Sequence, residues 1–203
     1  MSQMNGSDTN KYRSVGSKST VYSFTLCALF AALTAVCTFI NIPLPFTPIP
    51  INLATMAVFL SGGLLGPKYG ALSQIVYIMI GCIGLPIFSN YQGGVGVLVG
   101  PTGGYLAGYI LGAFVVGILL KVLTSNKEKN RTYIPKIVLS CIAGMLTYFA
   151  LGTIWFMNLT NTGLWASLVM CVFPFILGDL LKITAATLLI TALRRRIPHL
   201  HIT

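Results

Sequence analysis

The chain has 203 residues, of which 55% are hydrophobic and 8% are charged, and its formal net charge is +10. This composition excludes a water-soluble globular domain, and the length suffices for about six membrane spans of roughly 20 residues each. A basic balance of this size would suggest a nucleic-acid partner in a soluble protein, so the placement of the charges decides what it means.

The basic residues cluster at alternate ends of the predicted spans. They precede the first span, separate the second from the third and the fourth from the fifth, and follow the sixth, at Lys11, Arg13, Lys18, Lys68, Lys121, Lys127, Lys129, Arg131, Lys136, Arg194, Arg195 and Arg196. Positive charge marks the cytoplasmic side, so both termini are expected there and nucleic acid is not expected as a partner. We predict an all-α integral membrane protein with six transmembrane helices. Residues 1–20 would form a disordered cytoplasmic tail, 21–196 a single membrane domain and 197–203 a second cytoplasmic tail.

The first predicted span, residues 21–40, contains Ala28, Ala31, Ala32 and Ala35 at spacings of three and four. Side chains this small let another helix approach closely. The spacing leaves two interpretations open, namely packing within the bundle and docking of another protein.

The next connection, residues 41–50, contains four prolines, which exclude a helix and favour a stiff extended chain. Because this segment is also apolar, we expect it to pack over the bundle as a lid at Phe46, Thr47 and Pro48. The second and third spans, about residues 51–65 and 69–85, are short and interrupted by glycines, which would leave room for a cavity.

Residues 89–105 form a glycine-rich connection. Irregular backbone near membrane depth survives where it is buried in protein or lines a cavity, so we expect this segment to line a binding site with its own amide groups. A flexible hairpin is the alternative that the residues leave open. A phosphate-binding loop is excluded, because no Gly-Lys-Ser/Thr follows. The candidate ligand-binding residues here are Asn90, Tyr91, Gly94, Gly96, Gly100, Gly104 and Tyr105.

The last three spans are predicted at residues 103–123, 134–157 and 164–193. Gly104, Gly108 and Gly112 recur at intervals of four in the fourth span, which indicates a close-packing stripe. The sixth span is longer than a bilayer core requires, so we expect it to be tilted or to break at Pro174.

Asp179 and Lys182 place two charges inside this sixth span, on one helical face. Charges at membrane depth pair with each other, line a cavity or meet a ligand, so a structural pair, an ion relay and recognition of a polar ligand all remain open. No second carboxylate accompanies Asp179, and the two histidines lie in the C-terminal tail. We therefore predict no catalytic site, no metal site, no cofactor and no enzyme activity.

Three stretches, in this order, resemble the BioY family, the biotin-binding S components of energy-coupling-factor transporters. They are residues 46–51 (Phe-Thr-Pro-Ile-Pro-Ile), residues 93–106 with Gly-Pro-Thr-Gly-Gly-Tyr at 100–105, and residues 178–182 (Gly-Asp-Leu-Leu-Lys). The resemblance implies a multi-pass protein of the bacterial cell membrane that captures biotin at its outer side. It also implies uptake powered by a transmembrane T component and two ATPase subunits.

The resemblance further implies roles for particular residues. The alanine face of the first helix would dock the T component, and Asp179 and Lys182 would contact the ligand, with Asp179 on the ureido N–H groups. Asn90, Tyr91 and the glycine amides would line the upper pocket. Two rival functions remain, an S component for another vitamin and an ion-coupled secondary carrier in which Asp179 is the relay.

Overall fold

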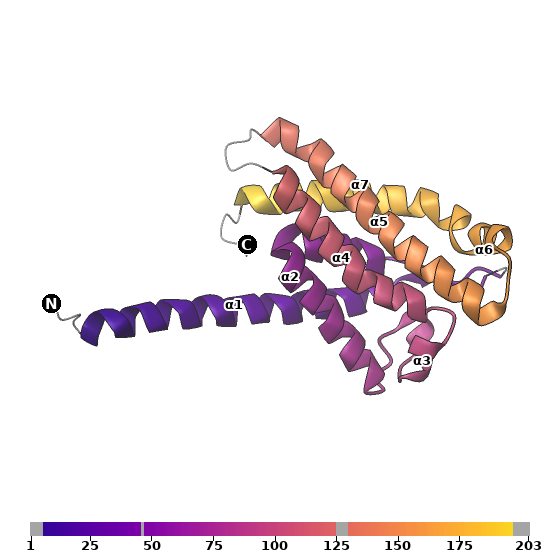
Figure 1. Cartoon of the computed structure of the whole chain (residues 1–203), viewed down its shortest axis with the longest axis horizontal. Coiled ribbons are helices and arrows are strands. Elements are labelled where there is room, and N and C mark those ends of the chain that lie inside the picture. Colours follow the sequence, from indigo (N-terminus) through magenta and orange to yellow (C-terminus); the bar gives the residue numbers. More distant parts are fainter. Residues whose placement is uncertain (1–5, 46, 125–129, 197–203) are drawn as a thin grey trace.

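A computed structural model describes residues 6–45, 47–124 and 130–196, and these form seven α-helices (Figure 1). Their bounds are α1 Gly6–Phe39, α2 Ala54–Cys82, α3 Gly96–Val99, α4 Gly103–Leu123, α5 Asn130–Thr160, α6 Leu164–Cys171 and α7 Phe173–Arg196. A short 3-10 helix, η1 (Ser89–Tyr91), precedes α3. Two strands, β1 (Asn41–Ile42) and β2 (Ile51–Asn52), pair antiparallel at the base of the proline-rich connection. The chain is thus helical, as predicted.

α2 occupies the centre of the bundle and packs against α1, α4 and α7, while α5 packs against α4 and α7. Four of the described segments are long and apolar enough to cross a membrane: Val21–Phe39, Gly103–Leu123, Tyr133–Thr160 and Phe173–Arg196. The two halves of α2 are not among them. The structure therefore supports a membrane protein with four clear spanning helices.

The second and third predicted spans form α2, which is continuous except for a break at Gly66. There φ is 79° and ψ is −176°, a conformation that favours glycine, and the next residue, Pro67, has no N–H to continue the helix. The two halves fold against each other, because a Cβ built on Gly70 would lie 2.8 Å from the Cα of Gly62. Glycine at both positions lets the two backbones approach this closely.

The break expected near Pro174 is confirmed. α6 ends at Cys171, and Val172 leaves the helical region with φ −124° and ψ −58°. α7 starts at Phe173, so Pro174 lies in its first turn, where a missing N–H costs nothing. The sixth predicted span is therefore two helices, and α7 carries both Asp179 and Lys182.

The glycine stripe of α4 is confirmed as a packing surface against α5. A Cβ on Gly104 would lie 2.2 Å from the Cβ of Trp155, and one on Gly108 would lie 2.8 Å from the Cα of Tyr148. One on Gly112 would lie 3.3 Å from the carbonyl oxygen of Gly144. Figure 1 shows α4 and α5 side by side, at the distance that these glycines permit.

α1 begins at Gly6, so its backbone is helical through much of the segment that was expected to be a disordered tail. No proline interrupts residues 6–39, and a helix once formed propagates through such a sequence. Residues 1–5 and the expected tail at 197–203 lie outside the described part of the chain.

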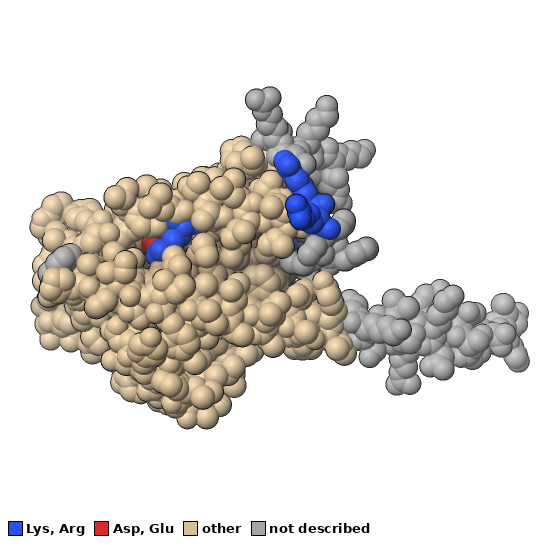
Figure 2. All heavy atoms as spheres, turned by 180° about the vertical axis from the view of Figure 1, so that it is seen from behind, with Lys and Arg blue, Asp and Glu red and all other residues tan. Residues whose placement is uncertain are grey.

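Lys and Arg side chains gather at one end of the molecule (Figure 2). At this end the Lys136 side chain donates to the backbone oxygen of Leu123, joining the start of α5 to the end of α4. Arg194 joins the end of α7 to Gly63, just before the break in α2. Away from this end, Figure 2 shows a red acidic group beside a blue basic one on the face in view. Among the described side chains the one acidic residue is Asp179, which pairs with Lys182.

Candidate functional site

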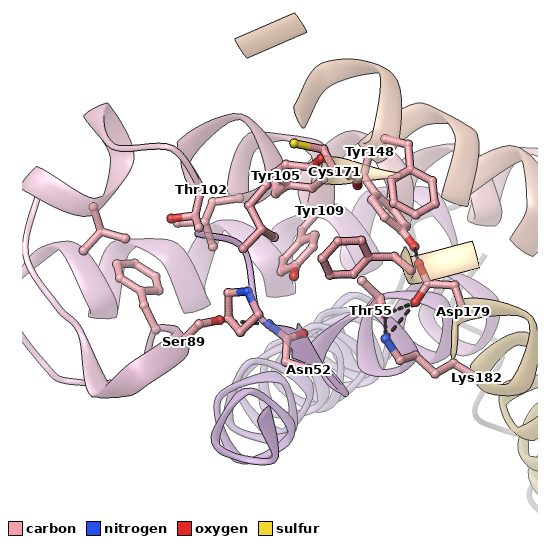
Figure 3. A pocket seen from close by; sticks show the side chains of 17 residues that line it. Asn52, Thr55, Ser89, Thr102, Tyr105, Tyr109, Tyr148, Cys171, Asp179 and Lys182 are labelled. Atoms are coloured by element: carbon pink, nitrogen blue, oxygen red, sulfur yellow. Dashed lines mark hydrogen bonds and ion pairs between the residues drawn. The ribbon is translucent and has the colours of Figure 1, made fainter. Parts of the chain in front are cut away.

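A cavity with an empty volume of about 590 Å³ lies among α2, α4, α5 and α7 (Figure 3). Its lining residues come from these helices, from α6, and from the two connections that flank α2. They are Ile49, Pro50, Asn52, Thr55, Phe88, Ser89, Val97, Thr102, Tyr105, Leu106, Tyr109, Tyr148, Phe149, Cys171, Phe175, Asp179 and Lys182.

One end of the cavity is charged. The Lys182 Nζ lies 2.7 Å from Asp179 Oδ1, and the two side chains are buried on the same face of α7. Thr55 of α2 donates to the same carboxylate oxygen at 3.3 Å and accepts from Lys182 Nζ at 3.2 Å. The hydroxyl of Tyr148, from α5, donates to Asp179 Oδ2. Three helices thus supply donors to one buried carboxylate, which satisfies its need for partners away from water.

A second polar group lies at the other end. Asn52 donates from its side-chain amide to the Ser89 hydroxyl at 2.8 Å and accepts from the backbone N–H of Ala54 at 3.1 Å. Figure 3 shows Tyr109 of α4 between this group and the charged end. Because Asn52 ends β2 and Ser89 begins η1, the cavity is closed here by the two connections that flank α2.

Much of the remaining lining is apolar and aromatic, at Ile49, Phe88, Leu106, Phe149 and Phe175. A ligand with an apolar body and polar groups at both ends would match such a lining. Within the described part of the chain, no group of three or more His, Cys, Asp or Glu side chains could hold a metal ion.

Three of the predicted ligand-binding residues, Asp179, Lys182 and Tyr105, line the cavity. The hydroxyl of Tyr105 is already engaged, because it donates to the backbone oxygen of Cys171 at 3.1 Å. Asn90 and Tyr91 do not line the cavity. Both are exposed and have positive φ angles of 60° and 58°, and Tyr91 stacks on Phe39 with 5.3 Å between ring centroids.

The four predicted glycines also lie outside the lining, and they shape the segment that covers the cavity. The N–H of Gly94 donates to the oxygen of Gly81 at 2.8 Å, and the oxygen of Gly100 accepts from Trp155 Nε1 at 2.9 Å. Gly104 packs on Trp155, and Gly96 has open space around it. The glycine-rich connection therefore contributes to the lining through its side chains, at Phe88, Ser89, Val97 and Thr102.

The predicted lid is placed over the cavity only in part. Phe46 lies outside the described residues, Pro48 is exposed, and Thr47 is buried. The hydroxyl of Thr47 accepts from the N–H of Ile49 at 3.3 Å, and Ile49 and Pro50 line the cavity. The role of this segment as a lid stays a prediction.

Sequence reasoning missed Asn52, Thr55, Tyr109 and Tyr148. Two signals could have found some of them. Asn52 and Thr55 are polar residues at the start of an apolar span, where such side chains usually face a cavity. Tyr109 follows Tyr105 by four residues and so shares its helical face. Tyr148 has no such signal, because its approach to Asp179 depends on how α5 packs.

The sequence model of the BioY family matches residues 9–199 of this chain. The chain is 40% identical over 167 residues to the biotin transporter BioY of Thermotoga maritima, which covers 82% of this chain and 92% of that protein. It is 31% identical over 177 residues to the biotin transporter BioY of Lactococcus lactis subsp. cremoris, covering 87% of this chain and 92% of that one. The fold matches a crystal structure of the S-component for biotin from an ECF-type ABC transporter, with a TM-score of 0.76, 28% identity and 95% of both chains covered.

Proposed function

The chain belongs to the BioY family, and we propose that it is the biotin-binding S component of an energy-coupling-factor transporter. It captures biotin at the outer face of the membrane and delivers it inward with a transmembrane T component and two ATPase subunits. The observation that carries this proposal is one cavity whose lining combines the buried Asp179–Lys182 pair, the Asn52–Ser89 polar group and apolar side chains.

Biotin carries matching groups. Its ureido head offers two N–H donors and one carbonyl acceptor, its thioether ring and chain are apolar, and its tail ends in a carboxylate. Asp179 accepts from a ureido N–H, and Lys182 donates to the ureido oxygen, both as charge-assisted hydrogen bonds. Phe88, Phe149 and the other apolar walls cover the ring and chain. The amide of Asn52 and the hydroxyl of Ser89 receive the carboxylate tail.

The proposal includes a six-crossing topology with both termini inside. The two halves of α2 each count as one short crossing, and α6 with α7 forms one interrupted crossing. The basic end of the molecule then faces the cytoplasm. Asp179 lies about 22 Å from Arg194 along α7, which puts the cavity in the outer half of the membrane domain.

The outward face of α1 is our proposed contact with the T component. Ala28 and Ala32, one turn apart, are exposed there. Ala31 is only 2% exposed and Ala35 is partly buried, so these two contribute to packing inside the bundle as well as to a flat surface. The alanine pattern thus serves both of the roles that its spacing allowed.

Calorimetric titration of the purified, ligand-free protein with biotin tests the ligand. We expect tight one-to-one binding, with thiamine and riboflavin giving no heat under the same conditions. A folded protein that does not bind biotin but binds either of the other vitamins would contradict the proposal. It would then be an S component for another vitamin.

A further inference from the structure

The three arginines that end α7 are alike in sequence but differ in the structure. Arg195 and Arg196 are exposed, whereas Arg194 is partly buried and donates from Nη2 to the backbone oxygen of Gly63 at 2.6 Å. Its guanidinium also lies over the ring of Tyr133 of α5, 4.9 Å from the centroid. One side chain therefore joins α7 to α2 and to α5.

The Gly63 carbonyl is left without a helical partner by the break in α2. It lies in the last turn before Gly66, and the residue four positions on is Pro67, which has no N–H to give. The end of a helix also carries partial negative charge, which favours a cation there. Arg194 supplies both the missing donor and the positive charge.

Close packing around Gly63 makes this contact possible. A Cβ on Gly63 would lie 2.5 Å from the Cδ1 of Ile190, one turn before Arg194. Glycine at position 63 thus lets α7 approach the α2 backbone closely enough for the arginine to reach its carbonyl. Asp179 is the sole acidic residue among the described side chains and is paired with Lys182, so Arg194 has no carboxylate partner within that part of the chain.

α7 and the first half of α2 are consequently tied at two places. The outer tie is Thr55 with Asp179 and Lys182, and the inner tie is Gly63 with Arg194. The break at Val172 separates α7 from α6, so no continuous helix holds the outer end of α7 in place. A slide of α7 by a single residue would move its side chains by about 1.5 Å, enough to separate Thr55 from Asp179.

We propose that Arg194 is a positioning residue for the ligand site, in that it sets the axial position of α7 along α2 and thereby holds Asp179 and Lys182 in place. The expected effect on biotin binding rests on the proposed function. The role of Arg194 in setting the position of α7 does not. Arg194 and its two contacts, Gly63 and Tyr133, do not line the cavity, so an effect on binding must be transmitted by the packing of α7 on α2 and α5.

The test compares Arg194→Gln with Arg195→Gln, which removes the same charge from an exposed neighbour on the same turn. Biotin titration should give about tenfold weaker binding for Arg194→Gln and no change for Arg195→Gln. In a Thr55→Val background, Arg194→Gln should reduce biotin affinity by clearly less than tenfold. The hydrogen bond from Thr55 to Asp179, which depends on the position of α7, is already absent there. Wild-type affinity in Arg194→Gln, or losses that multiply independently in the double variant, would overturn the proposal.

A second readout needs no ligand. Amide hydrogen exchange around Asp179 should quicken in Arg194→Gln and stay unchanged in Arg195→Gln. Unchanged exchange there would overturn the proposal even if biotin proves not to be the ligand. Should Arg194→Gln fail to fold, Arg194→Lys carries the same comparison, since it keeps a charge and a donor but loses the planar guanidinium over Tyr133.

Discussion

The carboxylate of Asp179 receives hydrogen bonds from three side chains on three helices, at a depth where unpaired polar groups are costly. Lys182 binds it from the same helix, Thr55 from α2 and Tyr148 from α5. A ligand that reaches this carboxylate meets an acceptor whose position is already fixed. Such pre-organisation lowers the cost of ordering the site on binding.

Replacing Asp179 with Asn should therefore weaken biotin binding strongly. The amide leaves the Lys182 ammonium without a counter-charge, which costs about 3–5 kcal/mol shared between stability and affinity. Titration calorimetry should show biotin affinity reduced by about 100-fold or more. Thr184→Ala is the matched control, because the Thr184 hydroxyl bonds only Leu180 on the exposed side of α7. An Asn variant that binds biotin as the wild type does would make Asp179 a structural residue.

Tyr148→Phe removes one donor and keeps the ring, which lies 4.8 Å from that of Phe149 between centroids. A hydrogen bond to a charged group contributes about 1.5–3 kcal/mol, so both the melting temperature and the biotin affinity should fall. Tyr105→Phe should lower affinity less, since its hydroxyl donates to an uncharged backbone oxygen. Equal losses in the two variants, measured by thermal unfolding and titration, would mean that the contact with Asp179 has no special weight.

At the scale of elements, two helix pairs position the site. α4 and α5 approach through glycines, and this brings Tyr105 and Tyr109 of one helix towards Tyr148 of the other; the rings of Tyr109 and Tyr148 meet edge to face at 6.2 Å. α2 and α7 bring Thr55 to Asp179. The cavity is the space that these two pairs enclose.

Gly108→Ala should disturb this arrangement. The new Cβ would lie 2.8 Å from the Cα of Tyr148, so α5 must shift and carry its tyrosine away from Asp179. Overpacking of this kind costs about 1–3 kcal/mol, and biotin affinity should fall together with the melting temperature. Gly96→Ala is the control, because nothing lies within 4 Å of its added methyl group. Equal behaviour of the two variants would contradict the packing account.

Much of this element pattern was predictable from the sequence. The bounds of α4 match the predicted fourth span, and the break before α7 lies two residues from Pro174. Both follow from local rules, since apolar length sets a span and proline ends or starts a helix. The fold-back of α2 at Gly66 was expected as a division between two spans, because the glycine and proline there cannot continue a helix.

The site was predictable only where one helix carries it. Asp179 and Lys182 share a face of α7 and could be paired from their spacing. The contact of Tyr148 with Asp179 depends on tertiary packing, which no local pattern encodes. Asn90 and Tyr91 were expected in the cavity because their segment is glycine-rich, but composition predicts flexibility and does not give the direction in which the chain turns.

At the scale of the whole molecule, the described part of the chain offers a cavity with a buried charged pair and an exposed apolar helix face. Its sequence has no nucleotide-binding motif, so the energy for uptake must come from partners or from an ion gradient. The proposed function assigns that energy to the ATPase subunits. The rival function, an ion-coupled secondary carrier, assigns that energy to a proton gradient, with Asp179 relaying the protons.

Uptake by vesicles separates these two accounts. Liposomes that contain this chain alone should not accumulate labelled biotin when a pH gradient is imposed. Liposomes that also contain a T component and the ATPase subunits should accumulate biotin when ATP is present on the side of the membrane where the ATPase subunits lie. Accumulation by the chain alone that collapses with the pH gradient would favour the carrier.

An experimental structure of the protein with biotin bound tests the central claim most directly. The proposal places the ureido head within hydrogen-bond distance of Asp179 and Lys182, and the carboxylate tail beside Asn52 and Ser89. Biotin bound in the opposite direction would contradict these assignments. Biotin outside the cavity, for instance beside Asn90 and Tyr91, would contradict the site itself.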